Sequence, residues 1–396
     1  MNINYTWKKS SLIIMYLLCG NLVYAQYVEL TFKDSKTNEV IPSVYIKAIK
    51  QNEKFETISN LDGKIKLPIK CDSIKTSHIA YESIAINKLE QDVVIFLTPR
   101  IQQLEDITVY SINLKEKFEY VLKNFSRLYV SGQHTYQCTY KDTYRVNDTL
   151  SRLLQFNMKW WDKNYNSKYK KPPLSQNQIG VGRTDYSKNR GRDIDNSSFD
   201  NNSFFGFLHL NNYLTALNLY GKNFIIDRIE KTEATTIIFF NALLETPKAN
   251  KMKLSECKVI FDRKTGAILF LKTHLINDNH IEEGVSEEKK IPYKIHYLDE
   301  HRMMSFVKEK NKFRISQLSF QDNFEVEMLG KKDAIETELN IYVTKIEKGN
   351  TIPKSELIDL KVKSIHEFIN KKTTNDPTIL LTTEEQEFIN EKNDNN

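Results

Sequence analysis

Near its start, the chain alternates apolar and polar residues in short runs, a pattern typical of β-strands. One run covers 44–49 and another covers 64–70, where lysines alternate with apolar residues and indicate a strand with one solvated face. A turn is predicted between them, because an Asp-Gly pair tolerates the positive φ of tight turns; its residues are Asn60, Asp62 and Gly63. Further runs at 74–79 and 83–86 extend the series. Short strands at such close spacing predict a β-sandwich.

The period of the pattern changes after Val109. Apolar residues then recur at helical spacing, with charged residues on the other side, at Leu114, Phe118, Val121, Leu122 and Phe125. A helix over 112–130 is therefore expected to link the sandwich to the rest of the chain. Strand patterns resume at His134 and continue to about 346 with short turns, which predicts an antiparallel meander. The expected fold class is mainly β, with the meander forming a curved sheet or half-barrel.

Helical signals appear twice more along the chain. The apolar segment 204–220 predicts one helix or two short pieces, ended by Gly221. In the tail, 357–369 is a candidate helix, and Thr382 with Glu385 forms a capping-box pattern that opens a last helix over 384–391. The expected organisation is a leader over 1–25, a sandwich over 26–111, a linking helix over 112–130, an antiparallel β domain over 131–350 and a helical tail over 351–396.

The segment 162–203 is the least core-like part of the β domain and is predicted to be a polar loop. Basic and aromatic residues are mixed in it, and such a mixture can bind an anionic glycan or nucleic acid. A solvated loop is the simpler interpretation of this composition, and we favour it. The candidate ligand or partner residues are Lys168, Tyr169, Arg183, Tyr186, Arg190 and Arg192.

The order of motifs in the first domain resembles a known family. A Pro-x-Val strand is followed by Thr57-Ile58-Ser59-Asn60-Leu61-Asp62-Gly63, then Ser77-His78-Ile79-Ala80-Tyr81, then Val94–Pro99, and finally Leu104–Val109. Over about 27–111 this resembles the carboxypeptidase-regulatory-like domain, a transthyretin-like, Ig-like sandwich common in envelope proteins of Bacteroidota-type bacteria. The chain departs from that pattern at Ala80, where the family has Gly, and in an opening strand without Gly. The resemblance implies no peptidase activity in the domain itself.

A second, weaker resemblance concerns the β domain. The hairpin connection Asp262-Arg263-Lys264-Thr265-Gly266 between two strands is similar to that of periplasmic lipoprotein-carrier half-barrels. This resemblance implies a curved sheet with a ligand pocket, although many hairpins use the same turn residues.

The first 25 residues have the features of a secretory signal. Lys8 and Lys9 precede a short apolar run, and Val23-Tyr24-Ala25 offers small residues at the cleavage positions. The run is too short to span a bilayer. Lipidation at Cys19 is disfavoured because the preceding residue, Leu18, is not small. We therefore expect an exported protein, periplasmic or associated with the outer membrane.

Composition and motifs exclude several classes of function. The chain holds 57 basic and 51 acidic residues, a balance too even to favour nucleic acid. His280-Ile281-Glu282-Glu283 matches half of a carboxypeptidase zinc motif, but Asn277–His280 is predicted to be a hairpin turn. His296 and His301 have no zinc-enzyme spacing and are assigned to a second, solvated turn. Nucleotide-binding and hydrolase motifs are absent from the sequence.

Three cysteines follow the leader, and their spacing fits no zinc site. We interpret Cys71, Cys138 and Cys257 as small buried residues, with a Cys138–Cys257 disulfide left open. No catalytic residue, metal ligand or cofactor is predicted.

The function expected is that of a non-catalytic binding or scaffolding module at the periplasmic face of the outer membrane. Its expected partner is an envelope protein or outer-membrane receptor. The alternative is a periplasmic lipid or glycan carrier with a pocket in the β domain. A second alternative is a hydrolase of unrecognised type.

Overall fold

The computed structural model describes residues 27–51, 53–68, 71–89, 91–100, 112–166, 176–190, 206–245, 251–286, 290–349, 351–359, 369 and 379–391. The structure is mainly β, with 64% of the described residues in strands and 13% in helices, which confirms the predicted fold class. Two small sheets and one large curved sheet contain all the strands of this part of the chain.

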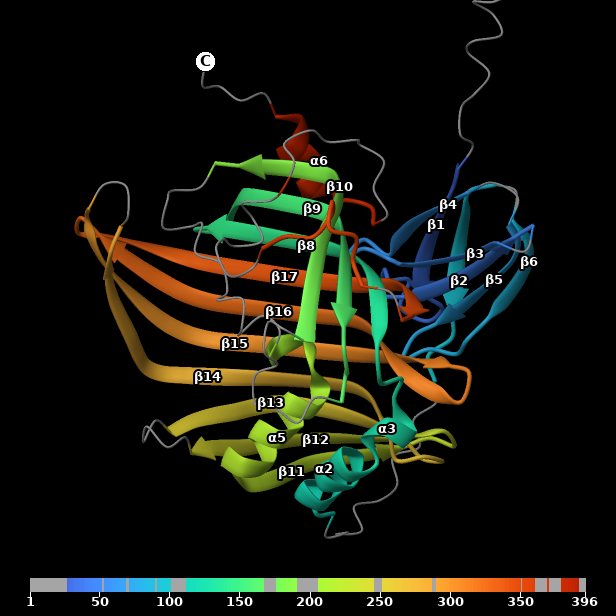
Figure 1. The fold of residues 1–396 in the computed structure, drawn as a ribbon, viewed down its shortest axis with the longest axis horizontal. Helices are drawn as coiled ribbons and strands as arrows, with labels where there is room; N and C mark the ends of the chain where they lie inside the picture. Colours follow the sequence, from blue (N-terminus) through green and yellow to red (C-terminus); the bar gives the residue numbers. More distant parts are fainter. Residues whose placement is uncertain are drawn as a thin grey trace, which may run out of the picture.

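The two small sheets form a sandwich at the start of the chain (Figure 1). One has the order β4-β1-β7 and consists of β1 (Tyr27–Asp34), β4 (Lys64–Pro68) and β7 (Val93–Leu97). The other has the order β3-β2-β5-β6 and consists of β2 (Tyr45–Lys50), β3 (Glu53–Ile58), β5 (Cys71–Ser77) and β6 (Ala85–Leu89). Alternate residues of β1, β2, β4 and β7 meet in one apolar core, as the period-2 pattern predicts.

The large sheet has ten strands in the order β10-β9-β8-β17-β16-β15-β14-β13-β12-β11. They are β8 (His134–Val146), β9 (Thr149–Asp162), β10 (Asn177–Asn189), β11 (Gly221–Lys231), β12 (Thr235–Glu245), β13 (Lys251–Asp262), β14 (Ile268–Val285), β15 (Pro292–Glu309), β16 (Lys312–Met328) and β17 (Lys331–Lys348). Every pair is antiparallel, which confirms the predicted meander. Because β10 and β11 form opposite edges, the sheet is curved but not closed.

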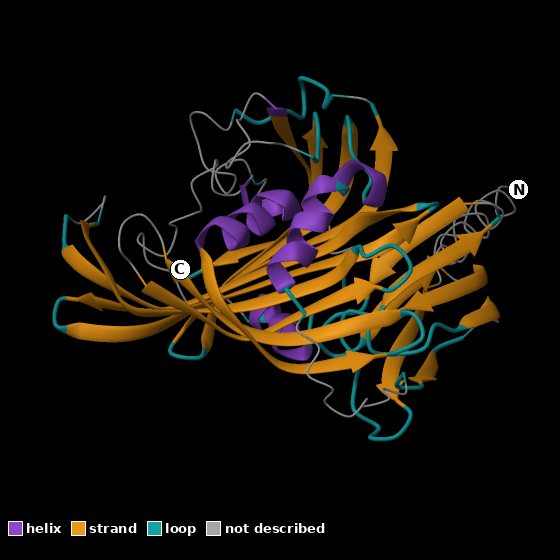
Figure 2. Cartoon of the chain, turned by 90° about the horizontal axis from the view of Figure 1, so that it is seen from below, coloured by secondary structure: helices purple, strands orange, loops and turns teal. Residues whose placement is uncertain are grey.

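Three helices lie against the concave face of the large sheet: α2 (Leu114–Lys123), α3 (Phe125–Leu128) and α5 (Leu210–Tyr220) (Figure 2). Asn113 caps α2 by accepting a hydrogen bond from the backbone N–H of Glu116. The buried face of α2 carries Phe118, whose ring contacts Phe224, Phe240 and Phe261 of the sheet. These helices and the inward side chains of the sheet form the main core of the molecule.

The sandwich and α6 (Thr383–Asn390) cover part of the convex face. The Arg314 guanidinium of β16 reaches the hydroxyl of Tyr45 on β2 at 2.8 Å and also pairs with Glu56 on β3. The Lys141 ammonium of β8 lies 2.6 Å from the carboxylate of Glu385, and both side chains are buried. The predicted capping box of α6 is confirmed.

The predicted turn at Asn277–His280 is wrong. β14 runs through it, and the register of the β14–β15 pair shifts between Ile276 and His280. The solvated turn assigned around His296 and His301 is also wrong, because β15 is continuous from Pro292 to Glu309. A β-bulge accommodates extra residues within a continuous strand. A run of polar residues can therefore belong to a bulge even though its composition is typical of a turn.

Three further expectations are resolved by the fold. Cys71, Cys138 and Cys257 are buried and form no disulfide, so the pairing left open for Cys138 and Cys257 is not made. Residues 206–208 and α5 give the two short helical pieces expected over 204–220. In the candidate helix over 357–369, residues 357–359 are not helical, and 360–368 lie outside the described residues.

Candidate functional site

The segment predicted to be a polar loop is a strand over Asn177–Asn189, so the loop prediction is wrong there. Tyr186 is buried against Leu381 and Phe388 of the tail. The Arg183 guanidinium pairs with Asp185 at 3.0 Å, and Arg190 pairs with Glu391 at 2.6 Å. Lys168, Tyr169 and Arg192 lie outside the described residues. In the described part, Tyr186 and Arg190 hold the C-terminal segment against the sheet, whereas Arg183 pairs within its own strand.

The predicted turn at 60–63 is confirmed, with Gly63 at a φ of +72°. The Asn60 side chain accepts a hydrogen bond from the Lys64 backbone N–H at 2.8 Å and donates one to the carbonyl of Leu381 at 3.0 Å. The Asp62 carboxylate accepts from the backbone N–H of Thr383 at 3.1 Å. The turn therefore also anchors the start of α6, which no local sequence signal indicates.

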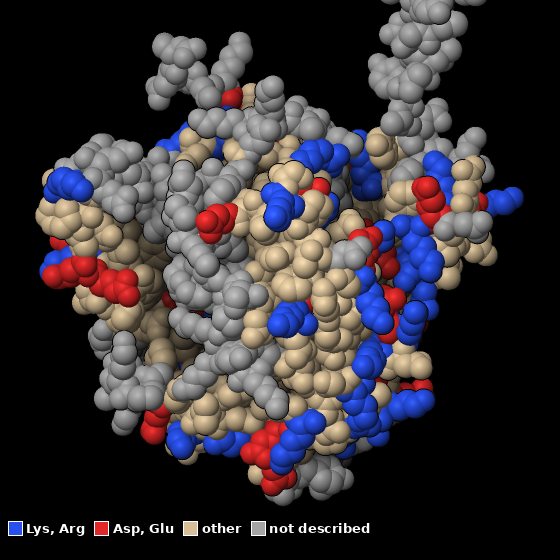
Figure 3. Space-filling view, in the orientation of Figure 1, with Lys and Arg blue, Asp and Glu red and all other residues tan. Residues whose placement is uncertain are grey.

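One end of the large sheet projects beyond the helices, as the long strands β14–β17 show (Figure 1). We define this projecting end as residues 280–298 and 322–336. Its exposed large apolar residues are Ile281, Val285, Leu298 and Leu329, with Val285 57% and Leu329 73% exposed. Figure 3 shows the molecule hollowed beside this end. A cluster of apolar and aromatic side chains forms the concave side of the projecting end: Tyr144, Phe324, Val326, Ile335, Tyr293, Ile295 and Tyr297.

A groove of about 430 Å³ lies at the tip of the projecting end. Its lining combines apolar side chains with charges of both signs: Glu283, Gly284, Val285, Pro292, Tyr293, Lys294, Glu327, Leu329 and Gly330. A Cβ on Gly284 would lie 2.5 Å from the ring of Tyr293. The absence of a side chain at Gly284 therefore leaves room for this ring to lie over β14. The groove can hold an apolar group between charged side chains.

A partly buried polar group lies on the concave face where α5 meets the sheet. The Arg302 guanidinium lies over the ring of Tyr213 and is 3.0 Å from Glu300. Asp322 lies directly across from Glu300 on β16. Burial, followed by the nearby charges of Glu300 and Asp299, raises the pKa of Asp322 to about 7. Neighbouring carboxyl groups of this kind can exchange a proton near neutral pH, which is the property a hydrolase would use.

The raised pKa of Asp322 predicts a pH-dependent effect of Asp322→Asn. A carboxyl whose pKa rises from 3.8 to about 7 on folding contributes its full stabilisation only below pH 3.8, and this contribution is lost progressively as pH rises from 3.8 to about 7. Asparagine resembles the protonated form, so the variant should melt above the wild type at both pH 5 and pH 8, with a difference about 2–4 °C larger at pH 8.

Thermal melts of both proteins at pH 5 and pH 8 check this expectation. Asp148→Asn, in an exposed turn, is the control and should show the same difference at both pH values. An Asp322→Asn difference that does not change with pH would contradict the assignment.

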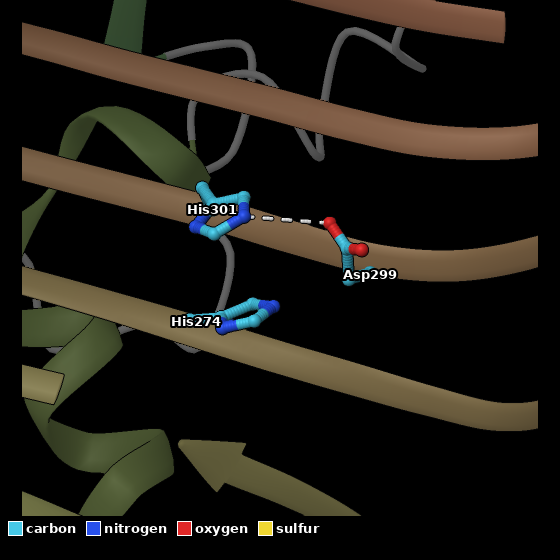
Figure 4. A group of neighbouring side chains, drawn as sticks. All are labelled: His274, Asp299 and His301. Atoms are coloured by element: carbon cyan, nitrogen blue, oxygen red, sulfur yellow. Dashed lines mark ion pairs between the residues drawn. The ribbon is translucent and has the colours of Figure 1, made fainter. Parts of the chain in front are cut away.

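A second polar group lies on the opposite face of the same strands (Figure 4). His274 of β14 is directly opposite His301 of β15, and their rings stack with centroids 4.0 Å apart. Nε2 of His301 lies 3.4 Å from Oδ1 of Asp299. Burial, followed by His274, lowers the pKa of His301, so the imidazole is favoured in its neutral, metal-binding form. Together these three side chains could hold a metal ion.

Sequence reasoning missed this group although a signal existed. Asp299-x-His301 places both side chains on one face of a strand, because strand side chains alternate. The region was predicted to be a turn, and a turn does not place alternate residues on one face. The cross-strand partner, His274, follows only from the register of β14 and β15, which the sequence does not display.

Comparisons with known proteins give no family. No family model matches the chain, and no curated protein matches it. One solved structure, titled "Ca2+-stabilized adhesin helps an Antarctic bacterium reach out and bind ice", covers 78% of this chain and 90% of its own. Its TM-score of 0.11 and 4% identity carry no argument about fold or function. Among the described helices, none is long and apolar enough to cross a membrane.

Proposed function

We propose that this chain is a non-catalytic binding protein of the bacterial cell envelope that binds a partner protein with the projecting end of its large sheet. The observation that carries this proposal is the grouping of Ile281, Val285, Leu298 and Leu329, all exposed, at that one end. Grouped apolar side chains at a protein surface are typical of interaction sites.

The chemistry of the tip fits a protein partner. The groove offers Val285 and Leu329 as apolar contacts, while Glu283 and Lys294 form an exposed ion pair at 2.8 Å beside them. An apolar centre with a charged rim is the usual composition of a specific protein interface. The resemblance of residues 27–111 to envelope sandwiches supports an envelope protein or outer-membrane receptor as the partner.

A lipid or glycan carrier is the second candidate. The observation that favours it is the apolar and aromatic surface on the concave side of the projecting end, which includes the partly buried Ile295 and Tyr297. Small-molecule sites are commonly concave and mostly apolar, with a few polar groups. On that surface, the Tyr297 hydroxyl donates to the Glu282 carboxylate at 3.1 Å.

Site-specific photo-crosslinking tests the proposed surface. A photoreactive amino acid at Leu329 should crosslink one defined envelope protein in the intact cell. The matched control is Leu219, at the end of α5, which is 52% exposed and distant in the fold from the projecting end. Adding Val285→Asp should reduce the Leu329 crosslink at least about tenfold, because a charge in an apolar contact costs more than about 1.4 kcal/mol. Equal crosslinking from Leu219 and Leu329 would contradict the proposal.

A further inference from the structure

The convex face of the large sheet carries a side-chain group that the proposed binding function does not use. Thr273 and Arg302 contact Tyr213 of α5 on the concave face. Because side chains alternate along a strand, the neighbouring His274 and His301 point to the convex face. We propose that His274, Asp299 and His301 bind a divalent transition-metal ion of the Zn²⁺ type there.

The distances suit such an ion. One ligand atom from each of the three residues lies within 4.8 Å of the other two. A tetrahedral ion with ligands at about 2.0–2.2 Å separates neighbouring ligand atoms by about 3.3–3.6 Å. The 3.4 Å between Nε2 of His301 and Oδ1 of Asp299 already has this value. The ligand nitrogen of His274 lies within 4.8 Å of the other two ligand atoms and would move closer to them on binding.

The His274 ring lacks partners of its own. Both ring nitrogens are buried, and within the described residues neither has a hydrogen-bond partner. A buried polar atom without a partner costs about 1–3 kcal/mol, and native proteins avoid most such cases. A metal ion on one nitrogen removes that cost for the nitrogen it binds and gives the ring a specific role, since neutral imidazole is the commonest metal ligand in proteins.

The surroundings support the ligands and leave one side of the ion open. The Asn323 side-chain amide donates to Oδ1 of Asp299 at 2.7 Å and fixes the orientation of that carboxylate. The side chains of His301 and Asp299 remain 29% and 27% exposed, so a fourth ligand can enter from solvent.

The donor set selects the class of metal. Two imidazoles and one carboxylate suit Zn²⁺, Fe²⁺, Co²⁺ or Ni²⁺, whereas Ca²⁺ and Mg²⁺ require oxygen ligands. The ligands stand on adjacent, paired strands in which His274 and His301 are register partners. Rigid strands hold side chains more exactly than loops do, so the site is preorganised for an ion.

Metal titration of the mature full-length chain tests the proposal. Equilibrium dialysis with Zn²⁺ and Co²⁺ should give one ion per chain. His274→Gln and His301→Gln should each weaken binding at least about tenfold, and Asp299→Asn should weaken it as well. His296→Gln is the matched control, because His296 lies on the same strand five residues from His301 and outside the group; it should bind as the wild type does.

The visible spectrum of the wild-type chain loaded with Co²⁺ is a second test, which does not depend on whether a variant folds. Ligation by nitrogen and oxygen should give d–d bands without a thiolate charge-transfer band. Absence of a stoichiometric ion in the wild type would overturn the proposal. So would a thiolate band, which would place the ion at a cysteine, or equal loss of binding in His296→Gln.

Discussion

Gly63→Val is expected to lower the unfolding free energy of the protein by about 2–6 kcal/mol. The residue has a φ of +72°, where a β-branched side chain is strained by about 1–3 kcal/mol. A Cβ at this position would also lie 2.8 Å from the backbone oxygen of Phe32 and 3.2 Å from the backbone nitrogen of Ile41. Since backbone atoms cannot move aside as a flexible side chain can, the clash adds a further destabilisation of about 1–3 kcal/mol.

Gly330→Val separates the two causes. Gly330 has the same φ of +72°, but a Cβ there would meet nothing within 4 Å. It should therefore show the strain alone, at about 1–3 kcal/mol. Urea unfolding of both variants measures the difference. Equal destabilisation by the two substitutions would show that the contact with Phe32 is unimportant, and an unchanged Gly63→Val would contradict the turn itself.

Arg314→Leu is expected to separate the sandwich from the large sheet. The Arg314 side chain is only 1% exposed, and it joins β16 to Glu56 and Tyr45 of the sandwich. Removing Arg314 leaves the Glu56 carboxylate with the Lys47 ammonium, 3.0 Å away and 36% exposed, as its remaining ion-pair partner among the described residues, so the loss should cost up to about 3–5 kcal/mol. Differential scanning calorimetry should show the single transition of the wild type divided into two, with the sandwich melting separately.

Two variants control for charge and for exposed pairs. Arg314→Lys keeps the charge but loses the planar fork of donors, so it should give an intermediate result. Lys64→Leu breaks an exposed pair with Glu29, in which both side chains are more than 40% exposed, and should cost less than about 1 kcal/mol. One cooperative transition in Arg314→Leu, at the wild-type temperature, would contradict the role of this residue.

Much of the fold could be predicted because its local signals agree. Strict alternation around Ile65 and the Asp62-Gly63 pair gives strands and a turn whose backbone requirement is local. Helical spacing from Leu114 to Phe125 likewise predicts the helix that lies on the concave face. In these segments the side-chain period alone determines which face is buried, so no tertiary information is needed.

The remaining features depend on contacts between distant residues. Polar residues of β10 can be buried because residues outside the strand form hydrogen bonds with them. For example, the side-chain amide of Gln155 donates to the Asp185 carboxylate at 3.3 Å. The polar run before His280 forms a bulge instead of a turn because β15 continues beside it. The projecting end and the His274 group arise from register between neighbouring strands. Register is set by the whole sheet, so a sequence pattern does not contain it.

Native mass spectrometry of the mature chain, purified gently from its own envelope, tests the central claim most directly. The proposed function predicts a complex with one defined protein, which is lost when Val285→Asp and Leu329→Asp are combined and retained in Leu219→Asp. A co-purifying lipid or sugar mass, or a complex that survives the double substitution, would contradict protein binding at the projecting end.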